Sequence, residues 1–125
     1  MKPPHLRVLI VESDADIGWL WQRHLQRAGA TVELVMSQEE AVDILSRQDF
    51  AVIVINLIVK GGSALAVADY VSYRQPDTKV IFVTNSTFFS DGSIFQHVSN
   101  ACAFIPIDTR PDDLAAMVEH YGTSR

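Results

Sequence analysis

The sequence predicts one α/β domain, residues 1–125, built on a doubly wound, five-stranded parallel sheet with five helices. Two observations lead to this prediction. Five short apolar runs alternate with segments in which apolar residues recur every three or four positions. The connections between them are short, so each pair of successive strands needs a right-handed crossover through a helix.

The five apolar runs have the length and content of strands buried on both faces of a parallel sheet. They cover Leu6–Val11, Thr31–Val35, Ala51–Ile55, Lys79–Val83 and Ala101–Ile105.

The first helix is expected between the first two strands and should end at Gly29. Its predicted buried stripe consists of Ile17, Leu20, Trp21, Leu25 and Ala28. Trp19 and Trp21 fall on nearly opposite sides of this helix, so at most one of them can lie in the core. The exposed one is a candidate interaction residue.

The second and third helices both have clear start signals. Ser37 and Glu40 have the spacing of a capping box, and the Gly61-Gly62 turn precedes the third helix, which should end before Pro76. The buried residues expected on these two helices are Ala41, Ile44, Leu45, Ala64, Val67, Ala68 and Val71.

The last two helices differ in the strength of their signals. Residues 90–98 predict only a short or mobile helix, capped by Ser90 or Asp91, and the apolar pair at 88–89 either packs inward or marks a partner surface. The last helix should begin at Pro111, followed by acidic residues that favour its first turn, and should end at Gly122. Its expected buried residues are Leu114, Met117, Val118 and Tyr121.

Composition excludes several classes of function. The net charge is −5 and there is no basic stripe, which disfavours direct nucleic-acid binding. No run is long enough to cross a bilayer and no signal peptide is evident, so the expected location is the cytoplasm, without membrane contact. The lone Cys102 has apolar neighbours and is predicted to be a buried core thiol. The four histidines lack metal-ligand spacing and are interpreted as structural or solvent-facing.

Polar residues gather where the predicted strands end. Functional groups of such sheets lie at the carboxyl ends of the strands, beside the point where strand order reverses. The residues at these ends are Glu12, Ser13, Asp14, Asn56, Thr84, Asn85, Pro106, Ile107 and Asp108.

In order and spacing, these residues resemble the receiver domain of two-component response regulators over nearly the whole chain. The run from Val8 to Asp14 is similar to the opening strand and acidic pair, and Val80–Thr84 to the strand that ends in a hydroxyl residue. Phe104 stands where receivers carry a switch aromatic, and the residues from Pro111 match the start of their last helix. The resemblance implies a CheY-like, flavodoxin-like sheet of order 2-1-3-4-5. It also implies a phosphoryl-accepting Asp after strand three, Mg²⁺ on the acids, and a Thr and a Lys that bind the phosphoryl oxygens.

The chain departs from this pattern at three positions, which predicts a degenerate receiver, or pseudo-receiver. Asn56 replaces the acceptor Asp, Ser13 replaces the second acid, and Ile107 replaces the Lys. An amide is not a usable nucleophile, and an apolar side chain offers a phosphate no charge. Glu12 is the one matched carboxylate, so no metal site is expected beyond weak Mg²⁺ binding. Three concerted changes favour a natural sequence released from this chemistry over one engineered substitution.

Simpler interpretations of the same residues stay open. Glu12 and Asp14 could only cap a loop and the first helix, and Thr84 could only bond the backbone. Phe104 is expected to be partly buried, with or without a rotamer switch when a partner docks. Asn85 would crowd the pocket, and Lys60 adds an unusual cation to the adjoining loop.

The leading hypothesis is a signalling domain, with no catalytic residues of its own, that acts through protein contacts. The resemblance implies a histidine kinase, another regulator or an output domain as partner. It also implies a homodimer face made of the helix at 90–98, the fifth strand and the last helix. The alternative is a flavodoxin-like module for a small ligand, although Glu12 and Asp14 would repel an anion. A third hypothesis uses these two acids as a catalytic pair, but no other residue supplies a base, a cation or an oxyanion donor.

Overall fold

The computed structural model describes residues 6–84 and 100–123. The strands are β1 (Arg7–Val11), β2 (Thr31–Val35), β3 (Val52–Asn56), β4 (Lys79–Thr84) and β5 (Ala101–Pro106). The helices are α1 (Ala15–Arg27), α2 (Gln38–Leu45), α3 (Ala64–Arg74) and α4 (Pro111–Thr123). The helix expected at 90–98, the apolar pair at 88–89 and Asn85 lie outside the described residues, so the last helix predicted from the sequence is α4.

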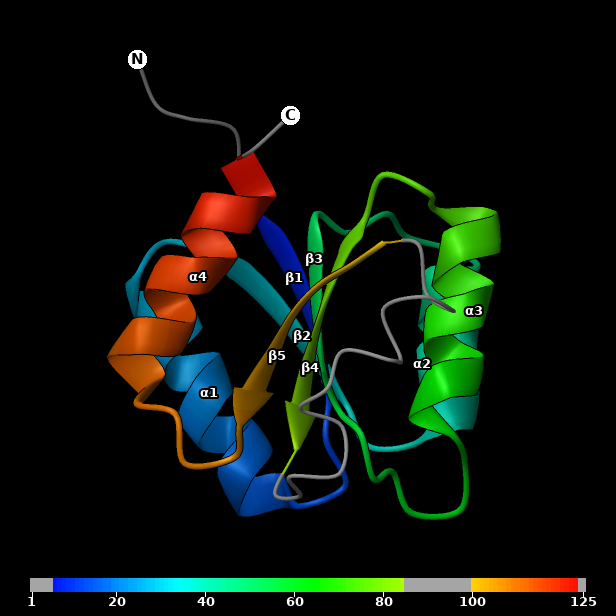
Figure 1. Cartoon of the computed structure of the whole chain (residues 1–125), viewed down its shortest axis with the longest axis horizontal. Coiled ribbons are helices and arrows are strands. Elements are labelled where there is room, and N and C mark those ends of the chain that lie inside the picture. Colours follow the sequence, from blue (N-terminus) through cyan, green and yellow to red (C-terminus); the bar gives the residue numbers. More distant parts are fainter. Residues whose placement is uncertain (1–5, 85–99, 124–125) are drawn as a thin grey trace.

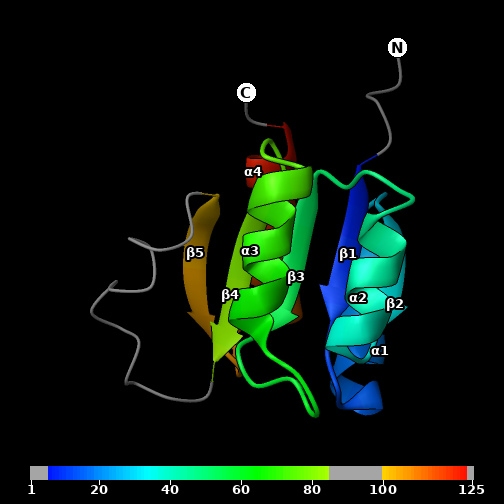
Figure 2. The same ribbon diagram turned by 90° about the vertical axis from the view of Figure 1, so that its right-hand side faces the viewer.

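The five strands form one parallel sheet in the order β2-β1-β3-β4-β5, which confirms the predicted topology. Helices α1 and α4 cover one face and α2 and α3 the other (Figures 1 and 2). Each face has its own hydrophobic cluster, one built around Trp21, Leu25 and Leu114, the other around Leu45, Val67 and Phe82. The two layers of helix on opposite faces are the doubly wound arrangement that the alternating sequence predicts.

The three inner strands are more deeply buried than the two outer ones. Residues 8–11, 52–55 and 80–83 of β1, β3 and β4 are fully buried, as expected for continuous apolar runs. Strands β2 and β5 are half-buried along most of their length because each has only one neighbouring strand in this sheet.

Helix α1 contacts the sheet through a narrower face than the sequence suggests. Its buried residues are Gly18, Trp21 and Leu25, three and four positions apart. A side chain at Gly18 would come within 2.8 Å of a methyl carbon of Leu34, so the glycine allows α1 to approach β2 closely. Centring the face on Gly18 leaves Leu20 46% exposed, and Ala28 is exposed at the helix end, so the prediction that both are buried was wrong.

The ends of the helices largely follow the predicted signals. Gly29 has a φ of 104° and its N–H bonds the Gln26 carbonyl, which ends α1 as expected. Helix α4 instead continues through Gly122 to Thr123. A side chain at Gly122 would collide with Leu6, so this glycine is required for close packing and does not stop the helix.

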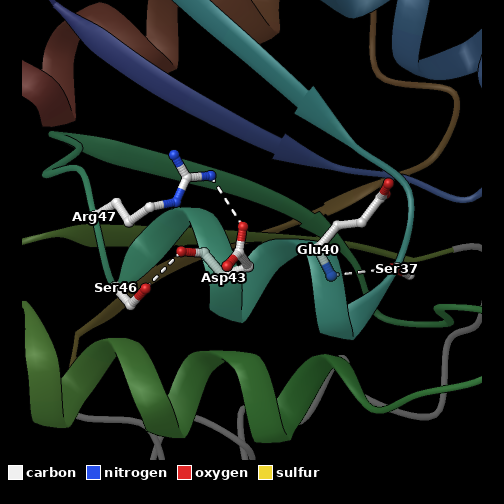
Figure 3. A network of polar contacts seen from close by, with 5 residues as sticks. All are labelled: Ser37, Glu40, Asp43, Ser46 and Arg47. Carbon is white, nitrogen blue, oxygen red and sulfur yellow. Dashed lines mark hydrogen bonds and ion pairs between the residues drawn. The ribbon is translucent and has the colours of Figure 1, made fainter.

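Helix α2 shows the capping that its sequence predicts (Figure 3). The Ser37 hydroxyl accepts the Glu40 N–H at 3.1 Å, while the Glu40 carboxylate accepts the N–H of Met36, one residue before the expected position. At the other end, Arg47 pairs with Asp43 at 2.9 Å. Side chains in and next to α2 therefore stabilise both ends of this helix of eight residues.

Cys102 is half-buried and packs against the hydrophobic cluster under α1 and α4, so it is less buried than the core thiol that the sequence predicts. It lies on β5 at an irregularity in the pairing with β4, where Ala101 faces Val80 and Ala103 faces Ile81. The extra residue of this bulge is displaced from the regular ladder. Burial still raises the pKa of the thiol from 9.0 to about 11, with a smaller opposing effect from Lys79.

Candidate functional site at the carboxyl edge of the sheet

Pairing register brings the predicted site residues to one edge of the sheet. Val11 pairs with both Val35 and Ile55, Asn56 pairs with Val83, and Thr84 pairs with Pro106. The loops that follow β1, β3 and β5 gather at this edge, at the lower end of the sheet in Figure 1. We call it the carboxyl edge, and the opposite one, where the strands begin, the amino edge.

Glu12 and Asn56 are joined directly. The Asn56 Nδ2 donates to Glu12 Oε1 at 2.8 Å, although the residues are 44 positions apart in the sequence. Asn56 Oδ1 accepts the Ile58 N–H at 3.0 Å, and Glu12 Oε2 accepts the Asp14 N–H at 3.0 Å. Glu12 is only 2% exposed. The buried carboxylate is thus stabilised by N–H donors, one of them from the acceptor-equivalent residue itself.

Ser13 connects three loops at the same edge. Its hydroxyl accepts the Lys60 N–H at 2.8 Å and donates to the Met36 carbonyl at 3.2 Å. These partners lie after β3 and after β2, whereas Ser13 follows β1. The residue that replaces the second acid has therefore become a structural link, a role that the sequence did not predict.

Asp14 caps helix α1, as the simpler interpretation proposed. Its Oδ1 accepts the N–H groups of Asp16 at 2.9 Å and Ile17 at 3.3 Å. Its own N–H bonds Glu12, which also fulfils the loop-capping interpretation of that acid. The donors of this loop are consequently used within the loop itself.

Ile107 and Thr84 meet through their backbones. The Ile107 N–H donates to the Thr84 carbonyl at 2.9 Å, which extends the β4-β5 pairing past the end of the strand. The Ile107 side chain packs against the hydrophobic cluster under α1 and α4. At the position matched to the lysine of receivers, this chain places an apolar side chain in partial contact with the core.

Phe104 is half-buried, as predicted, and stacks on Phe82 with ring centroids 5.0 Å apart. Phe82 is fully buried, so one side of the Phe104 ring is fixed by the core.

The remaining titratable residues do not extend the site. Among residues 6–84 and 100–123, no group of three or more His, Cys, Asp or Glu side chains is placed to hold a metal ion. His24 lies 3.6 Å from Asp112 and links α1 to α4, while His120 is exposed; His5 and His97 lie outside the described residues. No helix in the described part of the chain is long and apolar enough to cross a bilayer.

Comparison with known proteins agrees with this architecture. Residues 8–119 match the model of the response regulator receiver domain, and the chain belongs to that family. No curated protein matches the sequence. Receiver domains are signalling modules that interact with other proteins such as kinases and output domains.

Solved structures show the same fold at low sequence identity. A CheY-like receiver domain protein from Methanospirillum hungatei superimposes with a TM-score of 0.87 at 19% identity, covering 94% of both chains. The non-phosphorylated HemR receiver domain from Leptospira biflexa gives 0.85 at 20% identity, covering 96% of both. A chemotaxis response regulator from Vibrio cholerae gives 0.84 at 19% identity, covering 94% of this chain and 98% of the other. These structures therefore show that the chain has the receiver fold.

Proposed function

We propose that this receiver domain transmits information by docking to other proteins, without forming a phospho-aspartate. The observation that carries the proposal is the Asn56 side chain, an uncharged amide at the acceptor position whose Nδ2 bonds the buried Glu12. Phosphoryl transfer to a receiver needs a carboxylate nucleophile. The lone pair of the amide nitrogen is delocalised, and Asn56 Oδ1 accepts the Ile58 N–H.

The surroundings of Asn56 offer little to a phosphoryl group. Phosphoryl transfer depends on positive charge placed against the transferring oxygens. Ile107 supplies none, and its side chain contacts the core. Lys60 is exposed, and the structure fixes its backbone through Ser13.

The donor set is also a poor match for Mg²⁺, which prefers several oxygen ligands with negative charge. Glu12 is the carboxylate that is bonded to Asn56, and both its oxygens accept N–H groups. The Asn56 group nearest to Glu12 is a nitrogen donor, and the Ser13 hydroxyl is engaged by two loops. The amide takes the place next to Glu12 that a cation takes in active receivers, which supports the proposal of weak or absent metal binding.

The same bonds argue against a small anionic ligand. A flavin or phosphate loop after β1 would need N–H donors directed outward. Here the N–H groups of Asp14, Asp16 and Ile17 bond carboxylates of their own loop. Among the described residues of this edge, Lys60 is a cation but is exposed to solvent, and we find no base or oxyanion donor placed beside these acids, so we propose no enzymatic activity.

The partner is therefore a protein in this proposal: a histidine kinase, another regulator or an output domain in the cytoplasm. Strand β5 and helix α4 form part of the surface that receivers commonly use, and they include Phe104. The same surface would serve a homodimer. The acidic net charge of −5 argues against nucleic acid as the direct partner.

The decisive test is incubation with acetyl phosphate and Mg²⁺, followed by intact mass spectrometry. We expect no added phosphoryl group on the natural sequence. A matched variant that restores all three departing residue types (Ser13→Asp, Asn56→Asp and Ile107→Lys) should gain one. A stoichiometric, acid-stable and base-labile phosphoryl group mapped to any acid of the natural chain would contradict the proposal.

A further inference from the structure

The outer side of β2 carries a groove that the site at the carboxyl edge does not use. It lies between α1 and β2, has a volume of about 430 Å³, and is lined mainly by Asp16, Trp19, Gln22, Glu33, Leu34 and Met36. We call it the β2 groove.

Two large apolar side chains of the groove are exposed. Trp19 is 62% exposed and Met36 38% exposed, whereas Trp21, on the other side of α1, is 3% exposed. Exposed tryptophan and methionine are enriched in binding surfaces because they bury a large apolar area when a partner docks. Trp21 stabilises the core, so Trp19 is the tryptophan left for recognition.

The charge of the groove is entirely acidic. Asp16 and Glu33 line it from α1 and β2, and none of its lining residues is basic. Arg23, one turn beyond Trp19 on α1, is outside the lining. An anionic surface of this kind repels nucleic acid and anionic lipid, and attracts a cation. Glu33 alternates with Leu34 along β2 and points to the other face of the sheet, so a guanidinium over the Trp19 indole would gain a cation–π contact and the Asp16 carboxylate.

The backbone of β2 adds a directional feature. The Thr31 N–H donates to the Leu6 carbonyl, and the Val35 carbonyl accepts the Glu12 N–H, so the backbone groups of Thr31 and Val35 face β1. Because the orientation of these groups alternates along a parallel strand, the N–H and C=O groups of Val32 and Leu34 point away from β1. The Gln22 side chain already bonds the Val32 carbonyl at 3.5 Å. The Leu34 peptide group therefore faces the groove side of an edge strand, where an extended peptide can align.

We propose that the β2 groove binds an extended segment of a partner protein that carries an arginine flanked by apolar residues. The guanidinium lies over Trp19 beside Asp16. The apolar side chain two residues further along the extended segment points to the same face and covers Leu34 and Met36. The inference rests on the proposed function only in that the domain works through protein contacts. It makes no use of the phosphotransfer result, so either proposal can fail without the other.

The test is a titration of the ¹⁵N-labelled domain with the peptide acetyl-Val-Ser-Arg-Ser-Val-amide, in which the arginine and both valines share one face when the peptide is extended, followed by NMR. We expect saturable shifts of the Trp19 indole N–H and the Leu34 amide, reduced by added salt. The same peptide with neutral citrulline in place of arginine should bind at least about fivefold more weakly.

Variants then locate the binding site. Trp19→Ala should weaken binding about tenfold, and Asp16→Asn about threefold, without changing the overall spectrum. Tyr73→Ala is the matched control, because Tyr73 is an 85% exposed aromatic residue on α3, on the opposite face of the sheet. Its loss should leave binding unchanged. Equal binding of the two peptides, shifts confined to other surfaces, or no saturable shift would each overturn the proposal.

Discussion

The two edges of the sheet both carry buried polar side chains, but they differ in charge. At the amino edge Gln75, Thr78 and Asn100 are 4–8% exposed and uncharged. At the carboxyl edge Glu12 is 2% exposed and carries a carboxylate. The polar side chains of both edges are fully hydrogen-bonded: in the described residues, every buried side-chain nitrogen or oxygen has a partner.

At the amino edge, the bonds connect segments that must meet for the domain to fold. Gln75 donates to the carbonyls of Leu45 and Gln48 and accepts the Phe50 N–H, which fixes the end of α3 against the turn after α2. Thr78 bonds Phe50, and Asn100 bonds Thr78 and Ser72. Full satisfaction here stabilises the fold.

At the carboxyl edge, full hydrogen bonding of the polar side chains has a different consequence. In an active receiver this edge carries surplus negative charge, which a metal ion and a lysine balance. Here one amide and one hydroxyl take up the bonds, so the edge is complete without a ligand. Under the proposed function, the difference teaches that a site can lose its chemistry and still keep its polar residues, because those residues remain useful as structural links.

Removing the centre of the amino-edge cluster should have the largest effect. Gln75→Leu keeps the side-chain volume but leaves the Phe50 N–H and two carbonyls without their partner, which should lower the free energy of unfolding by about 3 to 5 kcal/mol. Urea denaturation followed by circular dichroism measures this. Gln26→Ala, at an exposed position on α1, is the control and should change stability by less than about 0.5 kcal/mol. A small effect of Gln75→Leu would mean that the amino edge is open to water.

The reactivity of the Cys102 thiol, which lies beside the amino edge, reports how well that edge excludes water. Because the pKa of Cys102 rises from 9.0 to about 11, its thiolate fraction at pH 8 should be about 100-fold lower than in the unfolded chain. Labelling with a disulfide reagent should be slower by a similar factor in the native state than in urea. The folded state holds this proton more tightly, so stability should fall as pH rises from 9 towards 11. Equal labelling rates in the two states would contradict the raised pKa.

Sequence reasoning succeeded where one physical rule decided the outcome. Apolar runs located the five strands to within one residue at each end, and the capping signal at Ser37 located α2. The rule that functional groups gather at the carboxyl ends brought Glu12 and Asn56 to one edge. Sequence reasoning failed where packing between distant segments determines which residues are buried. Leu20 was predicted to be buried, because periodicity cannot show that α1 contacts β2 through Gly18.

The roles of site residues were less predictable than their positions. The resemblance to receivers predicts an acid at the position of Asn56, but no sequence pattern shows which atom the Asn56 amide would bond. The link from Ser13 to Lys60 joins residues 47 positions apart, and it depends on how two loops approach each other.

Restoring the acceptor acid alone should destabilise the carboxyl edge. Asn56→Asp replaces a 2.8 Å hydrogen bond with two carboxylates in contact, which should lower the free energy of unfolding by about 2 kcal/mol at neutral pH. Mg²⁺ or mild acid should recover part of this loss, because Mg²⁺ balances both negative charges and a proton neutralises one of them. Asn56→Ala separates repulsion from the lost bond, since its destabilisation should not respond to Mg²⁺. A fully stable Asn56→Asp variant without metal would show that the edge still accepts surplus charge.

Removing the loop link should have the smallest effect. Ser13→Ala deletes the acceptor of the Lys60 N–H and the donor to Met36, and should cost about 1 kcal/mol because the groups it frees can bond water. Hydrogen exchange should be faster at the Lys60 amide than in the natural protein, while exchange in β3 should follow only the change in global stability. Ser46→Ala is the matched control, because the Ser46 hydroxyl bonds a carbonyl of its own turn in α2 and joins no second loop (Figure 3). If both variants exchange alike at Lys60, Ser13 does not hold the loops together, and the carboxyl edge depends on the Glu12 to Asn56 bond alone.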